Sequence, residues 1–172
     1  MSNYVVADPF IGAPTPVSVT DTVARWPLGL EVRAVDNGSG SAQIGGAVFR
    51  YCQGSDVGTS GLVVYIQNNS AVKLAAAQPF PVGVAAGVLD GTSKYGWVQV
   101  QGICDYGRGT NVALTSVNPV FIGTAGGFLV SGSVANSRII GMVAGANYTS
   151  SQSLSMTLEL NRPYVQNLTA SM

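Results

Sequence analysis

The sequence predicts an all-β protein, namely a single antiparallel β-barrel or sandwich domain with an extended N-terminal arm. Short runs of β-branched and aromatic residues follow one another at a spacing of ~8–12 residues, and clusters of Gly, Ser, Asn and Asp separate them. Prolines punctuate the first 27 residues, which lack this pattern. A length of 172 residues fits one such domain. We expect an arm at 1–27, a β-rich domain at 28–165 and a C-terminal tail at 166–172.

The N-terminal segment is expected to be extended and to dock on a partner. Pro9, Pro14, Pro16 and Pro27 fix φ and remove backbone donors, and the apolar side chains between them show no helical spacing. An isolated arm cannot bury these side chains, so we expect it to add a strand to another molecule, with a flexible tail as the alternative. The candidate partner-binding residues are Tyr4, Val5, Val6, Phe10, Ile11, Val17, Val19 and Trp26.

Strands are predicted throughout the remaining chain. The clearest is Ser153–Leu160, in which Leu154, Met156, Leu158 and Leu160 alternate with polar residues, so that one face is expected to be buried. The other runs with strand composition are Leu30–Val35, Ala47–Cys52, Leu62–Gln67, Tyr95–Cys104, Val112–Val117, Val120–Ile122, Phe128–Val130 and Arg138–Ala144.

Three local features refine this prediction. In Tyr95–Cys104, alternation is expected to place Val98, Val100 and Cys104 on one face and Trp97, Gln99, Gln101 and Ile103 on the other. The glycine-rich segment Gly123–Gly127 is expected to close a hairpin. Val72–Ala77 is expected to begin a helical turn that the following prolines end.

Composition excludes several classes of function. Eight basic and eight acidic residues cancel, and the basic ones are scattered, so we expect no direct nucleic-acid partner. The longest apolar stretches, such as Pro81–Leu89, are far shorter than the ~20 residues of a membrane span, and Met1–Tyr4 does not resemble a secretory signal. We therefore expect no membrane partner.

Catalytic patterns are equally lacking in the sequence. The chain has no histidine, which removes Ser-His-Asp and Cys-His chemistry and imidazole metal ligands. The acidic residues fall mostly in turns or in the arm, where solvation or capping is their usual role. The glycine-rich segments lack the Lys-Ser/Thr ending of a phosphate loop. We expect no enzyme activity, no cofactor and no metal site.

The two cysteines, Cys52 and Cys104, are 52 residues apart, and neither belongs to a pair with metal-ligand spacing. We expect reduced thiols that pack as small hydrophobic residues. A disulfide between them is the alternative, because both lie near the ends of expected strands.

One strand carries a family resemblance. The run Tyr95-Gly96-Trp97-Val98-Gln99-Val100-Gln101-Gly102 resembles a Tyr-Gly-Trp-x-Gln-x-x-Gly strand of the small capsid decoration (cement) proteins of tailed bacteriophages, with Tyr95, Gly96, Trp97, Gln99 and Gly102 as the matching residues. The likeness extends at pattern level over about 25–165, from Pro27-Leu28-Gly29 to the closing Leu158–Val165. Gln43–Arg50 departs from it, because relatives often carry a more acidic strand there.

The resemblance implies a structural virion protein. Such proteins lie on the outer surface of an icosahedral head, bridge neighbouring major capsid proteins of the HK97 type and resist the pressure of packed DNA. The resemblance also implies a homo-oligomer, with a trimer favoured over a dimer, that is made in the cytoplasm of the host bacterium. The alternative is a receptor- or glycan-binding β module or tail component of the virion, which would expose Trp97 or Tyr106 in a groove.

Overall fold

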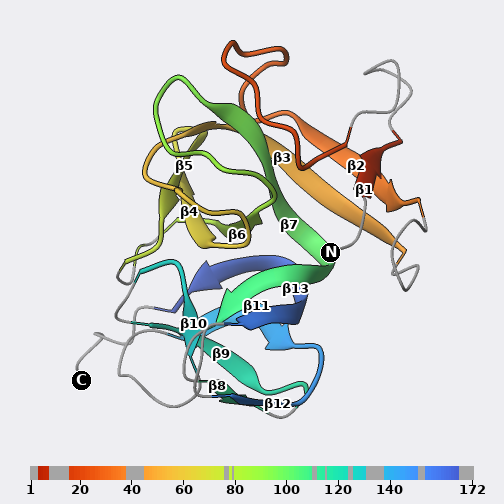
Figure 1. The fold of residues 1–172 in the computed structure, drawn as a ribbon, viewed down its shortest axis with the longest axis vertical. Helices are drawn as coiled ribbons and strands as arrows, with labels where there is room; N and C mark the ends of the chain where they lie inside the picture. Colours follow the sequence, from red (N-terminus) through yellow and green to blue (C-terminus); the bar gives the residue numbers. More distant parts are fainter. Residues whose placement is uncertain are drawn as a thin grey trace.

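The computed structural model describes residues 4–7, 16–37, 45–75, 78, 80–109, 112–114, 116–123, 126–130, 138–150 and 154–166. These residues form thirteen β-strands and no helix, which confirms the all-β class (Figure 1). The strands are β1 (Tyr4–Val6), β2 (Glu31–Asp36), β3 (Gly46–Gly54), β4 (Val63–Gln67), β5 (Ser70–Lys73), β6 (Val82–Ala85), β7 (Tyr95–Gly109), β8 (Val112–Leu114), β9 (Pro119–Ile122), β10 (Leu129–Val130), β11 (Arg138–Ala144), β12 (Tyr148–Ser150) and β13 (Leu154–Val165). Within the described ranges, no helix is long and apolar enough to cross a membrane.

The main sheet closes on itself twice. β3, β5, β4, β6 and β7 pair in a first circuit, because β7 pairs with both β6 and β3. β7, β10, β9, β11 and β13 pair in a second circuit, because β13 returns to β7. The two circuits share β7. Figure 1 shows this strand running down from the first circuit, in the upper part of the view, then bending and continuing into the second circuit, in the lower part. β8 and β12 pair separately.

A β-bulge near its middle lets β7 serve both circuits. Two consecutive residues of β3 pair with residues of β7 that are two positions apart, so that Val100 has no partner on β3. Gly102 has a φ of 94°, and a Cβ atom there would lie 2.8 Å from the carbonyl oxygen of Gly46. Only glycine combines this conformation with so close an approach. The bulge therefore bends β7 from the first circuit into the second.

The bulge also changes the faces of β7: side chains after it point to the face opposite to the one that strict alternation predicts. Val98 and Val100 pack in one core cluster, whereas Cys104 packs in the other cluster together with Trp97. The expectation that Cys104 shares a face with Val98 and Val100 is therefore wrong. Strict alternation assumes an unbroken pleat, and one inserted residue moves every later side chain to the opposite face.

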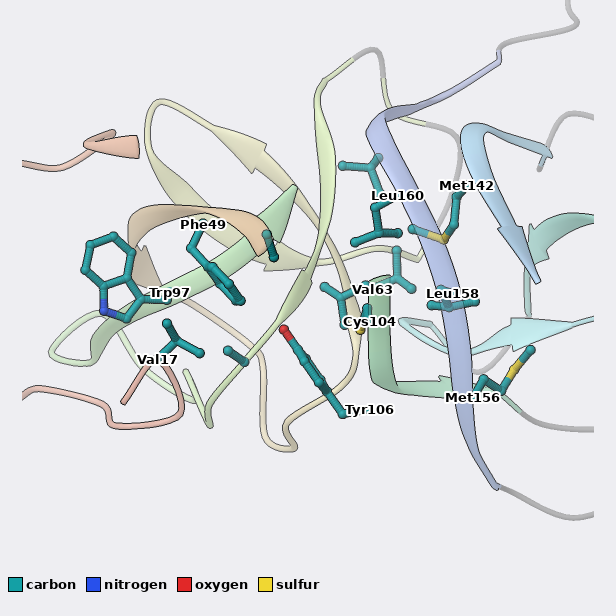
Figure 2. Packing of buried hydrophobic residues seen from close by; sticks show 14 of the residues in the cluster. Val17, Phe49, Val63, Trp97, Cys104, Tyr106, Met142, Met156, Leu158 and Leu160 are labelled. Atoms are coloured by element: carbon teal, nitrogen blue, oxygen red, sulfur yellow. The ribbon is translucent and has the colours of Figure 1, made fainter. Parts of the chain in front are cut away.

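Two clusters of buried side chains follow the two circuits. The smaller one draws members from all five strands of the first circuit: Cys52, Val57, Leu62, Val64, Ile66, Ala71, Ala85, Leu89, Val98 and Val100. The larger one fills the second circuit and continues beneath β1 and β2. Figure 2 shows this larger cluster, with Trp97, Phe49 and Val17 on one side, Leu158 and Met142 on the other, and Tyr106 between them.

The alternating pattern of β13 is confirmed. Met156, Leu158 and Leu160 are buried in the larger cluster, while Ser155 and Glu159 are exposed. The hairpin at Gly123–Gly127 is confirmed as well, because β9 and β10 pair antiparallel and the Gly123 N–H donates to the Phe128 carbonyl at 2.8 Å. Strands were found close to every predicted run.

The N-terminal segment departs from the expected free arm. β1 pairs antiparallel with β2, and the Val17 N–H donates to the Tyr4 carbonyl at 3.1 Å. Tyr4, Val6 and Val17, which were expected to bind a partner, are buried in the larger cluster of this chain. The expected strand addition therefore takes place within the chain, where β1 extends the chain's own sheet. Such pairing costs the entropy of closing the loop between β1 and β2, and this entropy cost grows slowly with loop length.

The helical turn expected at Val72–Ala77 is also wrong. Val72 and Lys73 belong to β5, and Val72 lies opposite Tyr65 on β4. Asn68 and Asn69 join the two strands, with φ values of 48° and 61°. Asparagine tolerates this left-handed conformation, which is typical of two-residue hairpin turns. Pairing with β4 therefore decides the structure of a run whose own pattern is too short to do so.

We expect the first strand to be needed for stability. Tyr4→Ala removes an edge-to-face contact with Phe49, whose ring centroid is 5.3 Å away, and should lower the free energy of unfolding by about 3–5 kcal/mol. Tyr4→Phe should cost only about 1 kcal/mol, because it removes one hydrogen bond. Urea denaturation measures both, with Val23→Ala as the control, since Val23 is 72% exposed. A Tyr4→Ala variant as stable as the wild type would contradict the packing of β1.

Candidate functional site

The aromatic residues of the motif strand pack inside the domain. Trp97 is 1% exposed, and its ring centroid lies 4.9 Å from that of Tyr51 and 5.4 Å from that of Trp26. Trp26, expected to bind a partner, is half-buried against this pair. Tyr95 exchanges two backbone hydrogen bonds with Asp21, at 2.8 and 2.9 Å. The motif strand thus holds residues 21–26 against the core.

A buried hydrogen-bond network surrounds Gln99, whose side chain is 0% exposed. Its amide oxygen accepts from the Tyr106 hydroxyl at 2.8 Å. Its amide nitrogen donates to the carbonyl oxygen of Ile103 at 2.9 Å and to that of Gln101 at 3.3 Å. The Tyr4 hydroxyl donates to the same Ile103 carbonyl at 2.6 Å. The network therefore spans the bend of β7 and ties β1 to it.

The motif residues have structural roles in this fold. Gly96 is buried with the Leu89 side chain against it, so that a Cβ would lie 3.0 Å from the nearest Leu89 carbon, and Gly102 permits the bulge. The expectation that a glycan-binding groove would expose Trp97 or Tyr106 is wrong, because Tyr106 is only 5% exposed and Trp97 still less. An aromatic ring must present a free face to stack on a sugar, and neither ring does.

The surroundings of Asp21 also differ from what the sequence predicts. The acids were expected to be solvated, but Asp21 is 7% exposed and pairs with Arg25, whose Nε lies 2.7 Å from its carboxylate. The Tyr51 hydroxyl donates to Asp21 at 3.0 Å. Burial raises the pKa of Tyr51 to about 12, to which the hydrogen bond to Asp21 also contributes. This cluster anchors the segment between β1 and β2.

A groove of about 560 Å³ opens on the surface of the described part of the chain. We call it the β2–β13 groove. Its lining comes from the ends of β2 and β13, from β3 and β7, and from the segment that leads into β6: Glu31, Arg50, Phe80, Pro81, Val82, Val100, Arg162, Pro163, Tyr164 and Val165. An isolated β-bridge between Pro81 and Tyr164 ties two of its walls together.

Three charged side chains, Glu31, Arg50 and Arg162, line the groove. Arg162 donates to both carboxylate oxygens of Glu31, at 2.8 and 3.1 Å. This hydrogen bonding, aided by the charges of Arg162 and Arg50, holds the pKa of Glu31 below its usual value. Arg50 donates through Nη2 to the Asn69 side chain at 2.7 Å, while its Nε–H is buried without an acceptor among the described residues.

The other residues that line the groove are apolar or aromatic. Phe80 stacks on Tyr65, with ring centroids 5.7 Å apart and planes inclined by 20°. Tyr164 is 52% exposed, between the buried residues Pro163 and Val165. Val82 and Val100 are buried beneath them. The groove thus combines guanidinium donors with an apolar wall.

A backbone irregularity aims Arg162 into the groove. Arg162 has a φ of 45°, a conformation uncommon for residues other than glycine, asparagine and aspartate. It lies in a bulge where three residues of β13 oppose the single residue Gly141 of β11. Bulges redirect side chains, and here Arg162 reaches Glu31 on β2. Sequence reasoning missed this groove, because its charged residues are far apart along the chain.

The remaining candidate residues are dispersed. Val5 is half-buried in β1 and Val19 is exposed, while Phe10 and Ile11 lie outside the described residues. The structure therefore does not gather the expected arm residues into one surface. Cys52 and Cys104 are free and fully buried, as expected, and burial raises the pKa of each thiol to about 12. No group of three or more potential metal ligands occurs within the described ranges.

Comparison of the chain with family models, with curated proteins and with solved structures found no match in any of the three.

The Gln99 network should be important for stability. Gln99→Leu leaves the buried Tyr106 hydroxyl without its acceptor and removes a donor from the Ile103 carbonyl, so we expect a loss of about 2–4 kcal/mol in chemical denaturation. In the Gln99→Leu background, Tyr106→Phe should destabilise the protein less than it does in the wild type, because the Tyr106 hydroxyl has already lost its acceptor. The exposed Gln101→Leu should change stability by less than about 0.5 kcal/mol. Strictly additive losses would argue against the network.

Both thiols should be inert in the folded protein. With pKa values near 12 and complete burial, Cys52 and Cys104 should not react with a thiol reagent at mildly alkaline pH. Both should react at once in concentrated guanidinium chloride, where the pKa values return to their usual range. A colorimetric thiol assay measures this difference. Rapid modification of either cysteine in the native protein would show that it is not buried.

Proposed function

We propose that this protein is a structural component of a virion, which decorates the outer surface of an icosahedral phage head and stabilises it. In this proposal it bridges neighbouring major capsid proteins of the HK97 type and acts as a homo-oligomer, with a trimer favoured. The observation that carries the proposal is the resemblance of the strand Tyr95–Gly102 to capsid decoration proteins.

The roles of the motif residues strengthen this resemblance. Trp97 packs the core, Gln99 satisfies the backbone at the bend, and Gly102 permits the bulge. A motif whose residues determine a bent, doubly paired strand is expected to be shared by proteins with the same fold. The likeness therefore concerns the residues on which this architecture depends.

Surface chemistry is a second line of support. Only 9% of the residues are charged, and apolar side chains are exposed on several elements: Val19, Val23, Leu28, Val35, Val88, Val117 and Tyr164. Removing charges from water at an interface is costly, so a weakly charged surface suits a protein that several neighbours cover. Many copies on one shell also allow each contact to be weak.

The folded N-terminal segment changes how contact with the capsid is proposed to occur. Tyr4, Val6 and Val17 are occupied by the chain's own core and do not reach a partner. Contact is instead proposed to use the folded surface, to which the β2–β13 groove belongs.

Reconstitution on heads tests this function. Heads from a phage that lacks the gene should bind the purified protein saturably, and the coated heads should resist heat and osmotic shock better than bare heads. Sedimentation and quantitative gel densitometry measure the binding, and release of packaged DNA measures the resistance. Heads without bound protein after incubation, or no gain in resistance, would overturn the proposed function.

A further inference from the structure

Charge is scarce in this chain, and a part of it lines the β2–β13 groove. Of the sixteen charged side chains, eight basic and eight acidic, three line this groove: Glu31, Arg50 and Arg162. Their sum is +1, so the groove favours an anionic ligand. This excess of positive charge lies against the aromatic wall of Phe80 and Tyr164.

Arg50 has a buried donor without a partner among the described residues. Its Nε–H is buried, and no described residue accepts a hydrogen bond from it. An unpaired buried donor is unfavourable, because it has lost its contact with water without gaining an acceptor. The neighbouring carboxylate of Glu31 is paired with Arg162, which donates to both of its oxygens.

The pair between Glu31 and Arg162 shows how the groove can hold a carboxylate. Arg162 binds both oxygens of Glu31 in a fork geometry, which is the usual way in which arginine recognises a carboxylate. A strained backbone conformation, with φ of 45°, holds Arg162 in place. Strain of this kind persists where the surrounding structure requires it and is concentrated at binding sites.

The size and lining of the groove limit the ligand. About 560 Å³ lies within the range of small-ligand sites, roughly 300–1,000 Å³, and accommodates a few residues of extended chain. Phe80, Tyr164 and the two prolines beside them offer apolar contact next to the guanidinium groups. A carboxylate flanked by apolar side chains matches both parts of this surface.

We propose that the β2–β13 groove docks an extended peptide segment of the capsid surface that carries an acidic side chain beside apolar ones. Arg50 receives the acidic side chain, and Phe80 and Tyr164 pack against its apolar neighbours. The identity of the partner rests on the proposed function, whereas the chemistry of the ligand rests on the groove.

Variants that change the groove in opposite directions test this proposal on heads. Arg50→Gln removes the cation and should weaken binding about tenfold or more, and Tyr164→Ser should weaken it several-fold. Glu31→Gln releases Arg162 and removes the internal carboxylate, so it should tighten binding several-fold. Arg33→Gln, which removes an exposed cation outside the groove lining, is the matched control for Arg50→Gln and should bind like the wild type. Thermal melting of each variant verifies its folding.

The outcomes separate the two proposals. If the wild type fails to bind heads, the proposed function is overturned, and with it the capsid as source of the segment. If the wild type binds and all groove variants bind equally well, the groove proposal alone is overturned. Tighter binding by Glu31→Gln together with weaker binding by Arg50→Gln supports it, because a purely structural role predicts no gain in affinity.

Synthetic peptides identify the ligand chemistry directly. Short overlapping peptides that tile the major capsid protein are titrated into isotopically labelled full-length protein, and amide shifts are followed at Tyr164 and Val165. We expect shifts from a peptide with Asp or Glu beside apolar residues and a weaker effect in high salt. The same peptide with Asn or Gln should bind about tenfold more weakly. Equal binding of the neutral peptide would overturn the acidic ligand.

Discussion

Both faces of β7 are buried along its first half, and the rest of the structure depends on this constraint. A strand with two buried faces cannot leave a polar side chain in water, yet Gln99 lies between Val98 and Val100 in its centre. Its amide must therefore find partners within the protein. The bend at Gly102 brings the later part of the same strand within reach, and Tyr106 supplies the donor. The bend and the buried amide thus require each other.

The N-terminal strand belongs to the same arrangement. At a β-bulge the ladder is interrupted, so backbone groups near the bend need partners from outside it. The Ile103 carbonyl accepts from both Gln99 and Tyr4. Tyr4 also packs against Phe49, a residue of β3 that belongs to the larger cluster and not to the core of the first circuit. The N-terminal strand β1, which is distant in sequence from β7, therefore completes the core near the bend of β7, where the two circuits meet.

Local pattern predicted the class and most strands, but not how the strands come together. Alternation along Met156–Leu160 identified a half-buried strand, because its register is unbroken there. The same rule misplaced Cys104, because the bulge depends on pairing with β3 and β13. The short runs of β5 and β6 and the proline-rich start gave no clear signal, since tertiary pairing stabilises them. The groove escaped prediction because Glu31 and Arg162 meet only when β13 crosses to the end of β2.

The scarcity of charge makes the placement of each charged group informative. A surface with few charges loses little free energy on desolvation, but apolar contact is non-directional and does not by itself define how two molecules align. Directional groups supply register and reject wrong partners. In this chain Arg50 and Arg162, on separate strands, are held at one groove by Asn69 and Glu31. If many copies cover a shell through weak apolar contacts, a single charged groove per copy is sufficient to fix the orientation of each, because multivalency supplies the remaining affinity.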